Sequence, residues 1–187
     1  MISTEAIRYK QIIGILKDLK PKVVMEIGTH KAFRPWEWKK SGLFFFYYGF
    51  DVFEDGTKEL NQKEMNGKGS CTMELAKNSL SGIQHKLYKG LTKDTLPAFK
   101  YENVKADFAF IDGGHSIETI QNDWDNVKDC MNPGGVVIFD DYYTLNVPEG
   151  FGCNEVVKNI EHEVLPETDV VLFEEGFLGV QLVKVNL

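Results

Sequence analysis

Acidic residues follow several short apolar runs in this sequence, and their placement predicts a polar binding site. Asp112 ends the run 106–111 and is followed by two glycines and His115. Other acids stand at or near the ends of similar runs: Glu26, Asp51, Asp140 and Asp141. Carboxylates accept hydrogen bonds from hydroxyl and ammonium groups and bind hard cations. Because the chain has no GxxxxGK[ST] motif, these acids favour such a ligand over a phosphate-cradling nucleotide site.

The hydrophobic pattern predicts strands that alternate with helices and so bring these acids to one edge of a sheet. Strands are expected at 23–27, 44–50, 84–88, 108–111 and 136–139, with a closing hairpin at 169–173 and 177–185. Helices are expected up to Leu19 with Ser3 or Thr4 as cap, within 57–81 with a break near 66–69, and at 94–100, 117–131 and 154–165. The segment 36–40 is not an obvious cofactor-covering helix.

This alternation is typical of an α/β fold with a mostly parallel sheet and helices on both faces. Parallel strands present their carboxyl ends at one edge, where ligands bind in such folds. The 187 residues contain no repeat or linker and suit a single domain, 1–187. The tail adds an antiparallel hairpin.

Composition and net charge limit the classes of partner and the cell compartment that we expect for this protein. A net charge of −7 argues against nucleic acid as the main partner, because phosphate binding favours a basic face. Three widely spaced cysteines without a CxxC pair fit a reducing compartment and exclude a thiolate zinc site. The chain begins without a signal-peptide pattern and has no run long enough for a membrane span. We therefore expect a cytoplasmic protein, a monomer or homodimer, with no membrane partner.

Four motifs in order, EIG, FD, FIDGGHS and PGGVVIFDDY, resemble the class I S-adenosylmethionine-dependent methyltransferases. The last two are the specific ones, and they are most similar to the metal-dependent O-methyltransferase branch of the catechol and macrocin type. The resemblance covers about 23–143. It implies a Rossmann-like fold with a seven-stranded sheet, S-adenosylmethionine as cofactor, and Mg²⁺ or another hard divalent cation.

The resemblance also implies roles for single residues. Glu26, Gly28 and Thr29 would form the cofactor loop after the first strand, and Asp51 would accept hydrogen bonds from the ribose hydroxyls; its alternative is a solvated acid that opens a turn. Three positions depart from the family pattern. Ala32 stands where a second glycine is usual, and Arg34 stands where a serine often follows. Leu91 stands where an acid near the adenine is usual, which leaves Thr92 as a cap or a polar contact.

Asp112, Asp140 and Asp141 are the metal ligands that the resemblance implies, and Asp112 would also contact the cofactor and take part in catalysis. Carboxylates on neighbouring strands, about 4.8 Å apart, repel each other unless a cation lies among them. His115 occupies the position of the catalytic lysine in catechol-type enzymes. It could take the proton from the acceptor hydroxyl, or it could simply cap the following helix.

The function predicted from these residues is metal-assisted transfer of a methyl group to a hydroxyl of a small-molecule acceptor, a sugar or a phenol. Two alternatives stay open. One is a metal-dependent hydrolase or phosphoesterase that uses the same carboxylates. The other is a non-catalytic binding subunit that kept the fold and lost cofactor affinity through its altered first loop.

Overall fold

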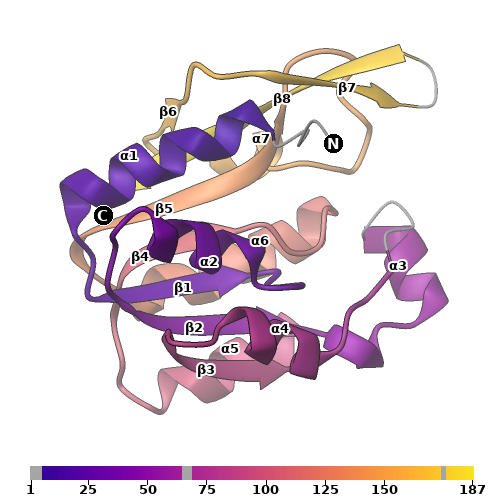
Figure 1. Ribbon diagram of the computed structural model, residues 1–187. Coiled ribbons are helices and arrows are strands. Elements are labelled where there is room, and N and C mark those ends of the chain that lie inside the picture. The colour runs from indigo at the N-terminus through magenta and orange to yellow at the C-terminus, as the bar shows by residue number, and fades with distance from the viewer. Residues whose placement is uncertain (1–5, 65–68, 174–175) are drawn as a thin grey trace.

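The computed structural model describes residues 6–64, 69–173 and 176–187, as one sheet between two layers of helices (Figure 1). Ser3 and Thr4, the predicted caps of the first helix, lie outside the described residues, as does most of the predicted break at 66–69.

The described strands form a single sheet in the order β3-β2-β1-β4-β5-β8-β6, with β7 also paired to β8. Their bounds are β1 Val23–Ile27, β2 Phe46–Asp51, β3 Gln84–Lys89, β4 Ala106–Ile111, β5 Met131–Tyr143, β6 Glu163–Val164, β7 Asp169–Phe173 and β8 Gly176–Asn186. The first five strands are parallel, and β8 runs antiparallel to β5. This confirms the predicted Rossmann-like α/β fold with a closing antiparallel hairpin.

Strands β6 and β7 share one position in the sheet. Val183 of β8 pairs with Phe139 on one side and with Val164 of β6 on the other. Val180 likewise pairs with Tyr143 on one side and with Asp169 of β7 on the other. The described strands therefore fill the seven positions that the resemblance implies, with the last position divided between two short strands.

The helices cover both faces of this sheet (Figure 1). Their bounds are α1 Lys10–Leu19, α2 Phe33–Lys40, α3 Lys58–Glu64, α4 Met73–Ser79, α5 Thr92–Lys100, α6 Ile117–Val127 and α7 Asn154–Val157, with 3-10 turns at Ile7–Tyr9, Phe53–Asp55 and Lys128–Cys130. Helices α1, α2 and α4 contribute to one apolar core, and α5, α6 and α7 contribute to the other.

Alternate residues of each central strand enter opposite cores, as the two-residue period of a strand requires. In β4, Phe108 and Phe110 join the core under α1 and α2, whereas Ala109 and Ile111 join the core under α6. A strand buried on both faces reads as a continuous apolar run, which is why these strands were predictable.

Three segments differ from the prediction. Residues 33–40 form helix α2, because Trp38 is fully buried against Phe45 and Phe108. The helix after Asp112 ends earlier than expected, and β5 already begins at Met131, where the backbone of 134–135 bonds to Leu187. The predicted helix 154–165 shrinks to the single turn α7, since 163–164 pair with the edge of β8 as β6.

Candidate functional site

A cavity lies at the carboxyl ends of β1, β2, β3 and β4. Its volume is about 70 Å³, within about 450 Å³ of unoccupied space that includes open solvent. Its lining residues come from the ends of β1 and β2, from the loops after these strands, and from α3, α5 and α6: Ile27, Gly28, Phe50, Asp51, Val52, Leu60, Glu64, Gly90, Leu91, Thr92, Gly113, Gly114, Thr119 and Asp123. Of the residues predicted to hold a cofactor, Gly28, Asp51 and Thr92 line it.

Gly28 lets the loops after β1 and β4 approach each other closely. It has φ +89°, in the left-handed region that favours glycine, and a Cβ there would lie 1.9 Å from the backbone oxygen of Asp112. The Asp112 amide in turn donates to the Ile27 carbonyl at 2.9 Å. The backbones of Gly28 and Asp112 are therefore in close contact.

Asp51 is held at the end of β2 by two backbone donors. Its Oδ2 accepts from the His30 amide at 2.7 Å, and its Oδ1 accepts from the Phe53 amide at 2.7 Å. Each carboxylate oxygen has a further lone pair. A side chain that is 8% exposed and lines the cavity differs from the solvated turn acid considered as the alternative.

Glu26 and Thr29 lie inside the protein, on the other side of the first loop. The Tyr47 hydroxyl donates to Oε2 of Glu26 and lies 2.9 Å from Oγ1 of Thr29. Burial raises the pKa of Glu26 to about 8, although the Tyr47 hydrogen bond and the charge of Arg34 oppose the rise. Neither residue is among those that line the cavity, so their contact with a cofactor stays a prediction.

Asp123 of α6 is a site residue that sequence reasoning missed. The residue is fully buried, and its Oδ2 has no hydrogen-bond partner within the described part of the chain. A Cβ on Gly113 would lie 3.6 Å from this oxygen, and both residues line the cavity. Burial raises the pKa of Asp123 to about 7, and nearby Glu64 adds to the rise. A buried carboxylate oxygen that accepts no hydrogen bond marks a place where a ligand could donate a hydrogen bond.

Glu64, at the end of α3, fixes the loop after β4. Its Oε1 accepts from the Ser116 hydroxyl at 3.0 Å and its Oε2 from the Ser116 amide at 3.1 Å. Its carbonyl accepts from the His115 amide at 2.9 Å. Ser116 also caps α6 by accepting from the Thr119 amide. The link between α3 and this loop joins residues 52 positions apart, which no local pattern could indicate.

Arg8 forms a buried ion pair with Asp140 at the carboxyl end of β5. Its Nε donates to Oδ1 at 2.8 Å and its Nη2 donates to Oδ2 at 3.0 Å. The Tyr9 hydroxyl donates to the same Oδ2 at 2.6 Å. Although burial opposes ionisation, the Arg8 charge and these hydrogen bonds lower the pKa of Asp140. The carboxylate is therefore ionised and paired inside the protein.

Tyr9 connects this ion pair with Arg34 of α2 and lies within the electrostatic influence of Asp112. The Arg34 guanidinium lies 3.6 Å from the centre of the Tyr9 ring, a cation–π arrangement. Burial raises the pKa of the Tyr9 hydroxyl far above its ordinary value, and the charges of Asp112 and Asp140 raise it further. Tyr9 therefore remains protonated at neutral pH and acts as a donor.

Asp141 and His115 lie together beside this pair. Oδ2 of Asp141 is 3.5 Å from Nδ1 of His115, and both residues are buried. The pairing of β5 with β8 is irregular between Phe139 and Tyr142, and Asp141 has φ +60°. Such an irregularity re-aims side chains that would otherwise alternate between the two faces of the sheet. The structure thus brings His115 close to Asp141.

The predicted metal ligands do not form a ready metal site. Within residues 6–64, 69–173 and 176–187, no group of three or more His, Cys, Asp or Glu is arranged to hold a metal ion. Asp140 is bound by Arg8 and Tyr9, and Asp141 faces His115. Because a hard cation needs several free oxygen ligands, this donor set does not fit Mg²⁺.

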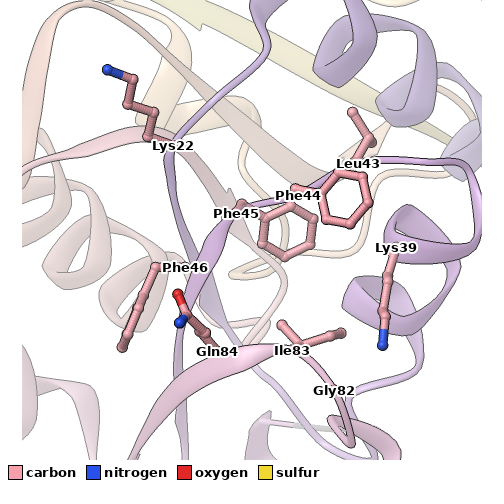
Figure 2. A pocket seen from close by; sticks show the side chains of 9 residues that line it. All are labelled: Lys22, Lys39, Leu43, Phe44, Phe45, Phe46, Gly82, Ile83 and Gln84. Carbon is pink, nitrogen blue, oxygen red and sulfur yellow. The ribbon is translucent and has the colours of Figure 1, made fainter.

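A second hollow lies at the opposite edge of the sheet, by the amino ends of β2 and β3 (Figure 2). It is lined mainly by apolar and aromatic residues: Leu43, Phe44, Phe45, Phe46, Gly82, Ile83 and Gln84, with Lys22 and Lys39. Ligands of open α/β sheets bind at the carboxyl ends of the strands. The acid-lined cavity is therefore the candidate site.

Comparison with protein families gives one match. A sequence model described as a methyltransferase domain matches residues 39–142, more than half of the chain. The matched part includes Asp51, Asp112 and the Asp140–Asp141 pair. No curated protein sequence matches the chain.

Solved structures with the same fold include several methyltransferases. An O-methyltransferase from Bacillus cereus in complex with SAH is 16% identical, with a TM-score of 0.62 over 99% of this chain and 83% of that one. The O-methyltransferase TomG from Streptomyces achromogenes, in complex with SAM, is 16% identical with a TM-score of 0.64 over 98% and 82%. An rRNA methylase from Streptococcus thermophilus is 14% identical with a TM-score of 0.63 over 100% and 99%. At this identity the likeness shows the fold.

None of the helices in the described residues has the length and apolar character needed to cross a membrane.

Proposed function

Because the chain belongs to the methyltransferase-domain family, we propose that it transfers a methyl group from S-adenosylmethionine to a hydroxyl of a small acceptor. The observation that carries this proposal is the cavity at the carboxyl ends of the strands, with Gly28, Asp51 and Asp123 in its wall. One oxygen of Asp123 has no hydrogen-bond partner among the residues that the structure describes. S-adenosylmethionine supplies an electrophilic methyl group on a sulfonium.

The residues of the cavity fit the parts of this cofactor. Asp51, an acceptor held by two backbone amides, would receive the ribose hydroxyls. The missing side chain of Gly28 would let the backbone approach the methionine part. Asp123 would accept a hydrogen bond from the adenine amino group, in place of the acid that Leu91 replaces, with Thr92 beside it.

His115 is the base that we propose for the acceptor hydroxyl, with Asp141 as its positioning residue. A carboxylate beside Nδ1 orients the imidazole, so that the other ring nitrogen can take a proton from the acceptor hydroxyl. Asp112 would contribute negative charge near the sulfonium. Metal assistance, as predicted from the sequence, gains no support from the donor set, and no step is assigned to a metal.

The acceptor that we propose is a small molecule, a sugar or a phenol. The net charge of −7 supports this choice over a nucleic acid, although one structure of the same fold is an rRNA methylase. The hydrolase alternative requires the metal group that the described carboxylates do not form. The non-catalytic alternative differs from the proposal in its loss of cofactor affinity as well as of turnover.

Calorimetry with S-adenosylmethionine and S-adenosylhomocysteine, with and without Mg²⁺, tests the proposal. We expect both to bind without Mg²⁺ and Asp51→Ala to weaken binding. Asp55→Ala, which changes an exposed acid of the next turn, is the control. Methyl transfer to a panel of sugars and phenols then separates an enzyme from a silent subunit. Absence of cofactor binding under all conditions would refute the proposal.

A further inference from the structure

We propose that the Arg8 guanidinium occupies, at Asp140, the place that a divalent cation takes in the resembling metal-dependent enzymes. Arg8 would thus be the permanent counter-charge of the acid at the end of β5. The inference deepens the proposed function, on which it rests for its catalytic meaning. The occupancy of Asp140 itself can be tested without methyl transfer.

The hydrogen bonds of Asp140 leave no room for a metal. An ionised carboxylate has about four lone-pair positions. Oδ1 accepts from Nε of Arg8 at 2.8 Å and from the Asp141 amide at 2.8 Å. Oδ2 accepts from Nη2 of Arg8 at 3.0 Å and from the Tyr9 hydroxyl at 2.6 Å. A metal could bind only by displacing at least one of these donors.

Arg8 is itself held from a second side, which opposes its displacement. Its Nη1 donates to Oδ2 of Asp169 at 3.0 Å, and the Asp169 carboxylate also accepts from the amides of Ile7 and Arg8. The Arg8 side chain is 10% exposed, and those of Asp140 and Asp169 are 2% and 14% exposed. Moving a metal in would leave a buried guanidinium without its main partner, which is strongly unfavourable.

The position of Arg8 also accounts for its neighbours. Its Nη2 donates to the Tyr9 oxygen at 2.9 Å, so the hydroxyl of Tyr9 is fixed from both sides. The Tyr9 ring in turn lies under Arg34, near Asp112. Arg8 is therefore a positioning residue that neutralises Asp140 and orients the Tyr9 hydroxyl.

Mn²⁺ binding, followed by electron paramagnetic resonance of the free ion, tests this inference. For the unaltered protein we expect no binding that depends on Asp140 at concentrations up to about 1 mM, the weak end of protein cation sites. Arg8→Met removes the charge while keeping much of the side-chain volume. It is expected to gain Mn²⁺ affinity by about tenfold or more and to lose it again in Arg8→Met/Asp140→Asn.

Arg8→Lys is the matched control, because it keeps a cation beside Asp140 and should bind no more Mn²⁺ than the unaltered protein. A second readout is the melting temperature, which Mn²⁺ should raise for Arg8→Met and leave unchanged for the unaltered protein. Asp140-dependent Mn²⁺ binding by the unaltered protein would overturn the inference. So would a folded Arg8→Met protein that binds Mn²⁺ no more tightly than the unaltered protein. If Arg8→Met does not fold, Mn²⁺ binding by the unaltered protein can still be compared with that by Asp140→Asn. Stronger binding by the unaltered protein would overturn the inference.

Discussion

The backbone oxygen of Asp112 lies 1.9 Å from the point where a side chain on Gly28 would begin. The loops after β1 and β4 therefore touch through a residue that has no side chain. This contact places Asp112 beside the first loop, and Gly28 and Gly113 on either side of it line the cavity.

Gly28→Ala should destabilise the protein by about 3 kcal/mol or more, because the methyl group collides with backbone and φ +89° is strained for alanine. Gly14→Ala is the matched control. Gly14 lies in α1 with nothing within 4 Å of its Cβ position, and its replacement should stabilise by up to about 1 kcal/mol. Urea unfolding measures both, and equal effects would contradict the predicted contact.

Asp123 should make the protein less stable as the pH rises. Its pKa is raised from 3.8 to about 7 in the folded state, so the folded protein keeps a proton that the unfolded chain loses near pH 4. The free energy of unfolding then falls between about pH 4 and pH 7 and levels off above that range. Asp123→Asn should remove this loss. The free energy of unfolding of the variant relative to that of the unaltered protein should therefore be higher at pH 8 than at pH 5, by on the order of 2 kcal/mol.

Asp125→Asn, on the same helix, is the control for this pH effect. Hydrogen bonds from Lys128 and Gln121 lower the pKa of the exposed Asp125, so its contribution has the opposite sign and is small. A stability difference for Asp123→Asn that does not change between pH 5 and pH 8 would contradict the raised pKa.

Asp123 should also select the adenine amino group. We expect the unaltered protein to bind S-adenosylhomocysteine roughly tenfold or more tightly than S-inosylhomocysteine, whose oxygen replaces the amino donor. In Asp123→Asn this preference should shrink, because the amide can donate to the inosine oxygen. Affinity for the adenine ligand should rise between pH 6 and pH 8 as Asp123 ionises. A preference unchanged in the variant would remove Asp123 from cofactor recognition.

His115 should govern turnover and leave cofactor binding intact. Once a methyl acceptor has been identified, kcat can be measured. His115→Asn is expected to lower kcat by about 10²- to 10⁴-fold, the usual contribution of a general base. Its affinity for S-adenosylhomocysteine should stay near that of the unaltered protein. Asp141→Asn should lower kcat less, because it only positions the imidazole. His162→Asn changes an exposed histidine and should have no effect; comparable loss there would exclude the assignment.

The Arg8–Asp140 pair should show strong energetic coupling. Asp140→Ala alone leaves the buried guanidinium without its main partner and should cost about 3 to 5 kcal/mol in stability. The double variant with Arg8→Met should recover part of this loss. The exposed Lys184–Glu163 pair, 3.4 Å apart, provides the comparison cycle, with a coupling below about 1 kcal/mol. Similar coupling in both cycles would show that burial adds nothing at Asp140.

The sequence predicted the sheet and the strand-end acids because both depend on local pattern. A parallel strand buried on both faces reads as an apolar run, and its end is marked by the first polar residue, as at Asp51 and Asp112. The same reasoning could not find Asp123, which occupies a polar position on an amphipathic helix, or Arg8, whose partner is 132 positions away. Their positions depend on tertiary packing.

The segments that were predicted wrongly have the same cause. Helix α2 depends on the burial of Trp38 by Phe45, just before β2, and by Phe108 of β4. The short α7 ends where the edge of β8 pairs with 163–164. The metal prediction treated the acids at the ends of β4 and β5 as one group. Local sequence pattern could not reveal that Arg8 and Tyr9 bind Asp140, because these residues are far apart in the chain.

The contact between Arg8 and Asp169 spans 161 positions of the chain. During synthesis, Asp169 is added long after Arg8, so the second carboxylate contact of Arg8 cannot form until the intervening chain has been made. Contacts between residues so far apart in the chain form slowly, because a long loop must close. The Arg8–Asp140 pair should therefore gain its second support only after strands β1 to β5 have been synthesised.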